Sequence, residues 1–123
     1  MARILIIEDD AQLRAMLRQM LESAGHEVSD AQDGRTGVAQ WASSPADLII
    51  TDILMPDKDG LEAIMEVRRT TPHAKIIAIT GGGNVGRVNL LHIANQLGAQ
   101  RTLLKPFDRR ELLSTVRELL DQP

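Results

Sequence analysis

Short apolar runs alternate with amphipathic stretches along the whole chain. Four runs rich in Ile, Leu and Thr and one more polar run predict strands, and they lie at residues 4–7, 27–31, 48–52, 75–80 and 101–105. Apolar residues at helical spacing predict helices at residues 11–24, 35–43, 59–70, 85–97 and from 109 onward. This alternation predicts an α/β fold of the (βα)₅ type, with a parallel sheet, right-handed crossovers and helices on both faces.

The ends of the first predicted helix carry specific signals. Asp10 has the position and the side chain of an N-cap, and Gly25 is expected to stop the helix. The apolar side of this helix repeats at Leu13, Met16, Leu17, Met20 and Leu21. We expect both of its Met residues to fill the core, and we expect the polar strand at 27–31 to lie at or near a sheet edge.

Composition and charge narrow the functional classes. We expect a single domain over residues 1–123, with no linker or repeat. The net charge of −3, with acids and bases interspersed, is not the basic footprint of a nucleic-acid-binding protein. No apolar stretch approaches the roughly 20 residues of a membrane span, so we expect no membrane insertion. The absence of cysteine excludes disulfides and thiolate metal sites, and it fits a cytoplasmic protein.

Polar side chains follow four of the predicted strands at the point where each strand ends. They are Glu8, Asp9 and Asp10 after the first strand, Asp52 after the third, Thr80 after the fourth and Lys105 after the fifth. Because the carboxyl ends of parallel strands meet at one edge, where open α/β sheets bind ligands, we expect these side chains to lie together. Asp10 is expected to act as a helix cap rather than as a ligand.

The residue types in this set favour one kind of chemistry. Carboxylates about 5 Å apart repel by roughly 3 kcal/mol per pair at an effective dielectric constant near 20, so the cluster must take up protons or bind a cation. Carboxylates without His or Cys suit a hard cation such as Mg²⁺. With the Lys105 ammonium and the Thr80 hydroxyl as donors, the set predicts Mg²⁺-assisted phosphoryl transfer onto the carboxylate of Asp52.

The same residues carry a resemblance to a known family over essentially the whole chain. The motifs are residues 4–10, residues 47–56 followed by Gly60, residues 77–80 and residues 104–107, and they are highly specific in this order and at these intervals. In these motifs the chain resembles the CheY-like receiver domain of two-component response regulators. The resemblance implies a doubly wound, flavodoxin-like sheet of five parallel strands in the order 2-1-3-4-5.

The resemblance also implies a role for each residue of the set. The Mg²⁺ ligands would be Glu8, Asp9, Asp52 and the backbone carbonyl of Leu54, with Mn²⁺ as an alternative cation. Asp52 would accept a phosphoryl group from a histidine of a sensor histidine kinase or of a histidine phosphotransfer protein. Thr80 and Lys105 would each contact a phosphoryl oxygen, and the bond between Lys105 and Pro106 would be cis. Such a domain catalyses its own phosphorylation and dephosphorylation without being a turnover enzyme.

Several positions depart from the family pattern. Most receivers carry Tyr or Phe three residues before the lysine, whereas this chain has Thr102. We therefore expect signalling to rely on the ordering of the Gly81–Gly83 loop and of the helix that follows. The interval from Thr80 to Lys105 is also longer than usual, so we expect an altered placement of that helix. Leu54, two residues after Asp52, is expected to hinder the attacking water and to prolong the life of the acyl phosphate.

Other functions fit parts of the pattern. A haloacid dehalogenase-like phosphatase also uses Asp and Mg²⁺, but it requires a second acid where Leu54 stands. A pseudo-receiver, an interaction module that never accepts phosphate, would lack the lysine or the acids, and all of them are present. Flavin binding is suggested by the fold class alone. Gly81, Gly83 and Gly86 match a dinucleotide fingerprint by letter, but no acid follows about 20 residues later. A stand-alone receiver and a receiver cut from a longer protein are equally compatible with the sequence.

Overall fold

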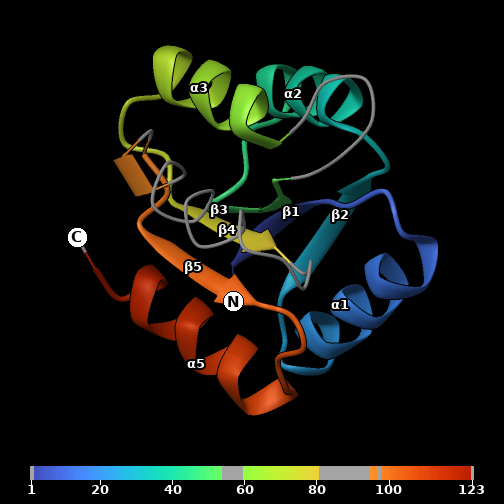
Figure 1. The fold of residues 1–123 in the computed structure, drawn as a ribbon. Helices are drawn as coiled ribbons and strands as arrows, with labels where there is room; N and C mark the ends of the chain where they lie inside the picture. Colours follow the sequence, from blue (N-terminus) through green and yellow to red (C-terminus); the bar gives the residue numbers. More distant parts are fainter. Residues whose placement is uncertain (1, 54–59, 81–94, 97, 123) are drawn as a thin grey trace.

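The computed structural model describes residues 2–53, 60–80, 95–96 and 98–122. Its centre is a sheet of five parallel strands in the order β2-β1-β3-β4-β5 (Figure 1). The strands are β1 (Arg3–Ile7), β2 (Glu27–Ala31), β3 (Leu48–Asp52), β4 (Ile76–Thr80) and β5 (Arg101–Leu104). The predicted fold class and strand order are therefore confirmed, and the polar strand β2 does lie at an edge of the sheet.

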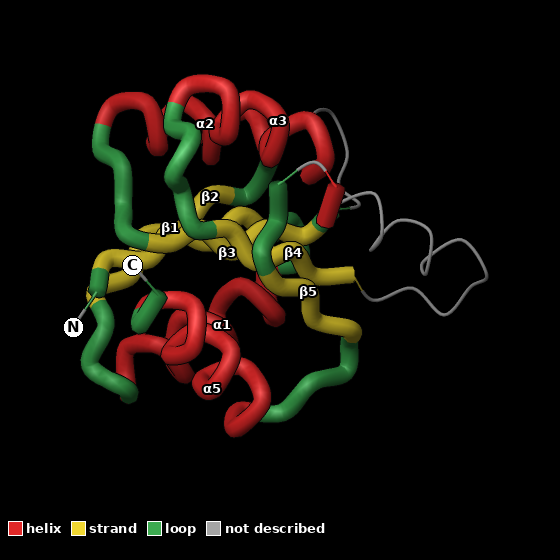
Figure 2. The backbone as a smooth tube through the Cα atoms, turned by 90° about the vertical axis from the view of Figure 1, so that its left-hand side faces the viewer, coloured by secondary structure: helices red, strands yellow, loops and turns green. Residues whose placement is uncertain are grey.

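Helices cover both faces of this sheet, as predicted. The helices α1 (Ala11–Ser23) and α5 (Arg109–Leu120) lie on one face, and α2 (Gly34–Ser43) and α3 (Gly60–Thr70) lie on the other (Figures 1 and 2). The first and last residues of α1, α2 and α3 differ from the predicted ones by at most one residue, and α5 begins at the predicted residue. The helix predicted at 85–97 lies outside the described residues, except for Asn95 and Gln96.

Two separate apolar cores hold the three layers together. Along β1, Ile4 and Ile6 point into the core beneath α1 and α5, whereas Leu5 and Ile7 point into the core beneath α2 and α3. All four side chains are buried. A strand with both faces covered has no polar side to show, which explains why this run reads as continuously apolar in the sequence.

The predicted signals at the ends of α1 are present. One carboxylate oxygen of Asp10, Oδ1, accepts hydrogen bonds from the backbone N–H groups of Gln12 at 2.9 Å and Leu13 at 3.3 Å. Gly25 follows the helix with a φ of 96°, a conformation that favours glycine. The prediction that Met16 fills the core is wrong, because this side chain is 39% exposed. It lies at the rim of the apolar stripe of α1, where Leu17 and Leu21 already fill the space against the sheet.

Two glycines allow backbone and helix to approach each other closely. A Cβ atom on Gly60, the first residue of α3, would lie 1.9 Å from the backbone oxygen of Asp52. A Cβ atom on Gly37, within α2, would lie 2.3 Å from Cδ1 and 2.5 Å from Cγ1 of Ile7, which are side-chain atoms rather than backbone. The end of β3 can therefore be seated against α3 only with glycine at position 60.

We predict that Gly60→Ala costs more folding stability than Gly37→Ala. The Gly60 substitution forces backbone against backbone and should cost at least about 2 kcal/mol, in the upper part of the range for overpacking. In the Gly37 variant the Ile7 side chain can turn aside, and the gain in helix propensity of about 0.5–1 kcal/mol offsets part of the loss. Urea unfolding of the two variants and the parent measures this difference. Equal losses in both variants would contradict the proposed role of Gly60.

Candidate functional site

The strand registers bring the predicted site residues to one edge of the sheet, the edge formed by the carboxyl ends of its strands. Thr51 of β3 pairs with Ile7 of β1, and Asp52 pairs with Ile79 of β4. At the far side the N–H of Lys105, just after β5, donates a hydrogen bond of 2.8 Å to the carbonyl of Thr80. Because each strand ends at the same level, residues from four different segments of the chain meet there.

Three carboxylates gather at this edge. Glu8, Asp9 and Asp52 each offer one oxygen, and these three oxygens lie within 4.8 Å of one another. Glu8 is only 1% exposed and Asp52 only 5%, whereas Asp9 is exposed. The predicted acidic cluster therefore forms, with two buried acids and one acid open to solvent. Oxygen ligands at this spacing suit a hard divalent cation.

Lys105 supplies the positive charge next to this cluster. Its Nζ donates a hydrogen bond of 2.7 Å to Oδ2 of Asp52 and lies 3.5 Å from Oε1 of Glu8. Desolvation of the ammonium lowers the pKa of Lys105, but the hydrogen bond and the charge of Asp52, together with Glu8, outweigh it, and the pKa is raised. The lysine therefore stays charged and offsets part of the repulsion among the acids.

Glu8 is held in a way that leaves one oxygen for a ligand. Its N–H donates to the carbonyl of Ala31 at 3.0 Å, and its Oε2 accepts a hydrogen bond of 3.1 Å from the N–H of Asp10. Burial raises the pKa of Glu8 to about 7; the charge of Asp52 acts in the same direction, while the Asp10 hydrogen bond and the charge of Lys105 act against it. The other oxygen, Oε1, accepts no hydrogen bond from any described residue.

The hydroxyl of Thr80 is the second polar group without a partner. Thr80 is fully buried at the end of β4, and its Oγ1 makes no hydrogen bond within the described part of the chain. An unsatisfied buried polar group costs about 1–3 kcal/mol. At the same edge of the sheet, the Thr80 hydroxyl and Oε1 of Glu8 thus make no hydrogen bond to a described residue, although Oε1 lies 3.5 Å from the Lys105 ammonium. A cation bound to the acids and an anionic oxygen bound to the hydroxyl would satisfy both.

Other predictions at the site have mixed outcomes. Asp10 serves as a helix cap, as expected, and the bond between Lys105 and Pro106 is cis. Leu54 and the Gly81–Gly83 loop lie outside the described residues. The sequence did not single out Arg14, whose side chain reaches the backbone of Glu8. No motif marks an arginine at this position, so only the packing of α1 against β1 could reveal it.

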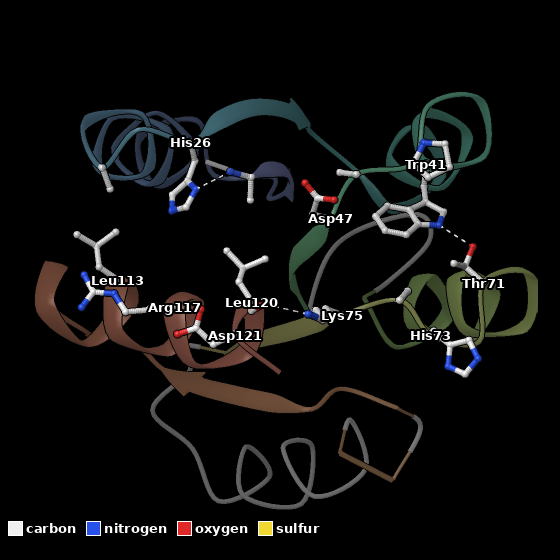
Figure 3. A pocket seen from close by; sticks show the side chains of 15 residues that line it. His26, Trp41, Asp47, Thr71, His73, Lys75, Leu113, Arg117, Leu120 and Asp121 are labelled. Carbon is white, nitrogen blue, oxygen red and sulfur yellow. Dashed lines mark hydrogen bonds between the residues drawn. The ribbon is translucent and has the colours of Figure 1, made fainter. Parts of the chain in front are cut away.

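A cavity of about 720 Å³ lies at the opposite edge of the sheet, where the strands begin (Figure 3). Several of its polar groups are engaged in hydrogen bonds. The N–H of Ala2 donates to Nδ1 of His26, the Trp41 indole N–H donates to Thr71, and Lys75 donates to carbonyls at the end of α5. Its volume alone would favour this cavity as a ligand site. The acidic cluster and the two buried oxygens without a hydrogen bond to a described residue, those of Glu8 and Thr80, instead favour the edge where the strands end.

Comparison with known proteins agrees with this geometry. The family model of the response regulator receiver domain matches residues 4–117. The chain is 34% identical over 120 residues to the transcriptional regulatory protein CpxR of Klebsiella pneumoniae, covering 98% of this chain and 50% of CpxR. It is 31% identical over 118 residues to the chemotaxis protein CheY of Thermotoga maritima, covering 95% of this chain and 96% of that protein. The chain thus spans half the length of CpxR and nearly all of CheY.

A solved structure shares the whole fold. A putative response regulator from Chloroflexus aurantiacus superposes with a TM-score of 0.91 at 30% identity, covering 98% of both chains. Within the described residues no helix is long and apolar enough to cross a membrane. The family model, the relatives and the strand order agree, and the chain belongs to the receiver domains of two-component response regulators.

Proposed function

We propose that this receiver accepts a phosphoryl group on Asp52 in a reaction that depends on Mg²⁺. The observation that carries the proposal is the meeting of three acids, the Lys105 ammonium and the unpaired Thr80 hydroxyl at one edge of the sheet. The residues present fit the cation, because one oxygen of each acid lies within 4.8 Å of the others, and Oε1 of Glu8 accepts no hydrogen bond from a described residue. Glu8, Asp9, Asp52 and the backbone carbonyl of Leu54 would hold it.

The transfer step forms one bond and breaks one. A carboxylate oxygen of Asp52 attacks the phosphorus of a phosphohistidine, while the bond between phosphorus and the donor nitrogen breaks and its electron pair stays on the imidazole. Lys105, already beside Asp52, offsets the negative charge on the phosphoryl oxygens, and the Thr80 hydroxyl donates a hydrogen bond to one of them. When bound, Mg²⁺ would supply further positive charge against the three carboxylates and the phosphoryl oxygens.

The donor would be a sensor histidine kinase or a histidine phosphotransfer protein, since receivers of response regulators are phosphorylated by histidine kinases. Two large apolar side chains are exposed on the segments that we expect to dock this partner. Met16 on α1 is 39% exposed, and Leu104 at the end of β5 is 41% exposed. Scattered apolar side chains among polar ones suit an encounter that must form and dissolve between transfers.

We expect a receiver that modifies itself rather than a turnover enzyme. A phosphatase of the dehalogenase type needs a second acid two residues after its nucleophile, where this chain has Leu54. A pseudo-receiver would keep the fold but lack part of the site, whereas the acids, the lysine and the hydroxyl are all in place.

We predict that the parent protein gains one phosphoryl group on incubation with Mg²⁺ and phosphoramidate, as measured by intact mass. The gain should be absent without Mg²⁺ and absent in Asp52→Asn. Asp47→Asn is the matched control, because Asp47 lies at the opposite end of the same strand and is exposed. It should be modified like the parent. An unmodified parent, next to another receiver that is modified under the same conditions, would favour a pseudo-receiver. Turnover of a phosphomonoester would favour a phosphatase.

We also predict that Glu8→Gln stabilises the metal-free protein in a pH-dependent way. The pKa of Glu8 rises from an ordinary value of 4.5 to about 7 on folding. Between these two pH values the folded state holds more protons than the unfolded state, so stability falls as pH rises from 4.5 to about 7. The full cost is present above 7 and is absent below 4.5. The neutral Gln avoids this cost, so the stability gained by the variant should be about 1–3 kcal/mol larger at pH 8 than at pH 5.

Urea unfolding with a chelator at the two pH values tests this prediction. Asp9→Asn is the control for the loss of one acid, because Asp9 is exposed. Its effect on stability should change less with pH. A Glu8→Gln gain that is the same at pH 5 and pH 8 would show that Glu8 does not take up a proton over this range.

A further inference from the structure

The backbone carbonyl of Glu8 has a side-chain partner that the proposed reaction does not use. Arg14 is the fourth residue of α1, and its NH1 donates a hydrogen bond of 2.8 Å to the Glu8 carbonyl oxygen. With this bond, the N–H, the C=O and one carboxylate oxygen of Glu8 each have a fixed partner. Only Oε1 makes no hydrogen bond to a described residue, and it faces Lys105 at 3.5 Å.

Arg14 is itself held from the edge strand β2. Its Nε lies 4.0 Å from Oδ1 of Asp30, and the other oxygen of Asp30 accepts a hydrogen bond of 2.7 Å from NH1 of Arg18. The carbonyl of Asp30 accepts a further hydrogen bond, from the side chain of Gln40 on α2. Asp30 is thus fixed by groups from both layers of helices, and it limits where the guanidinium of Arg14 can lie.

We infer that Arg14 is a positioning residue for the metal site, which sets the place of Glu8 so that its Oε1 meets the oxygens of Asp9 and Asp52. This inference rests on the proposed binding of a divalent cation. A guanidinium that grips the backbone fixes the turn between β1 and α1, and this turn carries both Glu8 and Asp9. Groups that orient metal ligands in this way typically change metal affinity by about 10–100-fold when removed.

The positioning role and a simple charge effect predict opposite signs. Arg14 carries a positive charge near the acidic cluster. If it acted only through that charge, its removal would strengthen the binding of a cation. If it acts by holding Glu8, its removal weakens binding, because the carboxylate then samples positions away from the other two. The direction of the change in affinity therefore separates the two effects.

The chain offers a matched control in Arg18, one turn further along α1. Arg18 also pairs with Asp30, and it contacts Glu22, but within the described residues it makes no hydrogen bond or ion pair with Glu8. Arg18→Met removes the same charge and loosens the same carboxylate of Asp30. It leaves the hydrogen bond from Arg14 to Glu8 in place.

The experiment measures Mn²⁺ binding to the unphosphorylated protein by the loss of the free Mn²⁺ signal in electron paramagnetic resonance. The variants are the parent, Arg14→Met, Arg14→Gln and Arg18→Met, and far-UV circular dichroism and thermal unfolding with a chelator show that each is folded. We expect about tenfold or weaker binding in both Arg14 variants and unchanged or slightly tighter binding in Arg18→Met. If Arg14→Met does not fold, the more polar Arg14→Gln is judged by the same criterion.

Each result decides one question. Arg14 variants that bind Mn²⁺ as tightly as the parent, or more tightly, overturn the inference and leave the proposed metal site intact. Equal weakening in Arg14→Met and Arg18→Met also overturns it, because the loss would then come from Asp30 or from general loosening of α1. A parent protein that binds no Mn²⁺ contradicts the proposed function itself.

Discussion

The ion pair between Lys105 and Asp52 determines how three carboxylates can share one edge of this sheet. The 2.7 Å contact places a positive charge against the most central acid, and the same ammonium lies 3.5 Å from Glu8. One lysine does not balance three acids, and the pKa of Glu8 is raised first by burial and then by the charge of Asp52. The folded protein therefore keeps an unfavourable charge arrangement that a divalent cation would relieve. A cost in stability of this kind is common at functional sites.

The rest of the fold keeps this edge rigid. Two apolar cores fix the sheet between its layers of helices, so the strand ends cannot separate to relieve the repulsion. Gly60 lets α3 begin directly against the backbone of Asp52, and the strand registers set Asp52, Thr80 and Lys105 at one level. At the opposite edge, side chains such as Lys75 and Trp41 pair with nearby groups (Figure 3). The two edges of one sheet thus differ, because buried polar atoms without a hydrogen bond to a described residue lie where the strands end, at Glu8 and Thr80.

The proposed reaction and the inferred role of Arg14 involve two different sets of residues. In the proposed reaction Asp52 and its neighbours carry the chemistry. A second set of residues, Arg14 on α1 and Asp30 on β2, would hold Glu8 in place, because Arg14 contacts the backbone of Glu8 and Asp30 contacts Arg14. This chain matches half of CpxR and nearly all of CheY. Among these relatives, the same domain therefore occurs both with and without a further segment. A site assembled within the receiver itself is what such modular use requires.

The sequence alone determined the fold class, the strand positions and the identity of the acids, the hydroxyl and the lysine. It could do so because a parallel sheet imposes its own order: buried strands read as apolar runs, and their ends collect at one edge. It did not determine which oxygens remain unpaired, the raised pKa of Glu8, the exposure of Met16 or the contact from Arg14 to Glu8. These properties depend on distances between segments that are far apart in the chain or on how a helix sits on the sheet. Local sequence patterns determine where the helices and strands form. Only the packing of these helices and strands determines the contacts and the pKa values of the site residues.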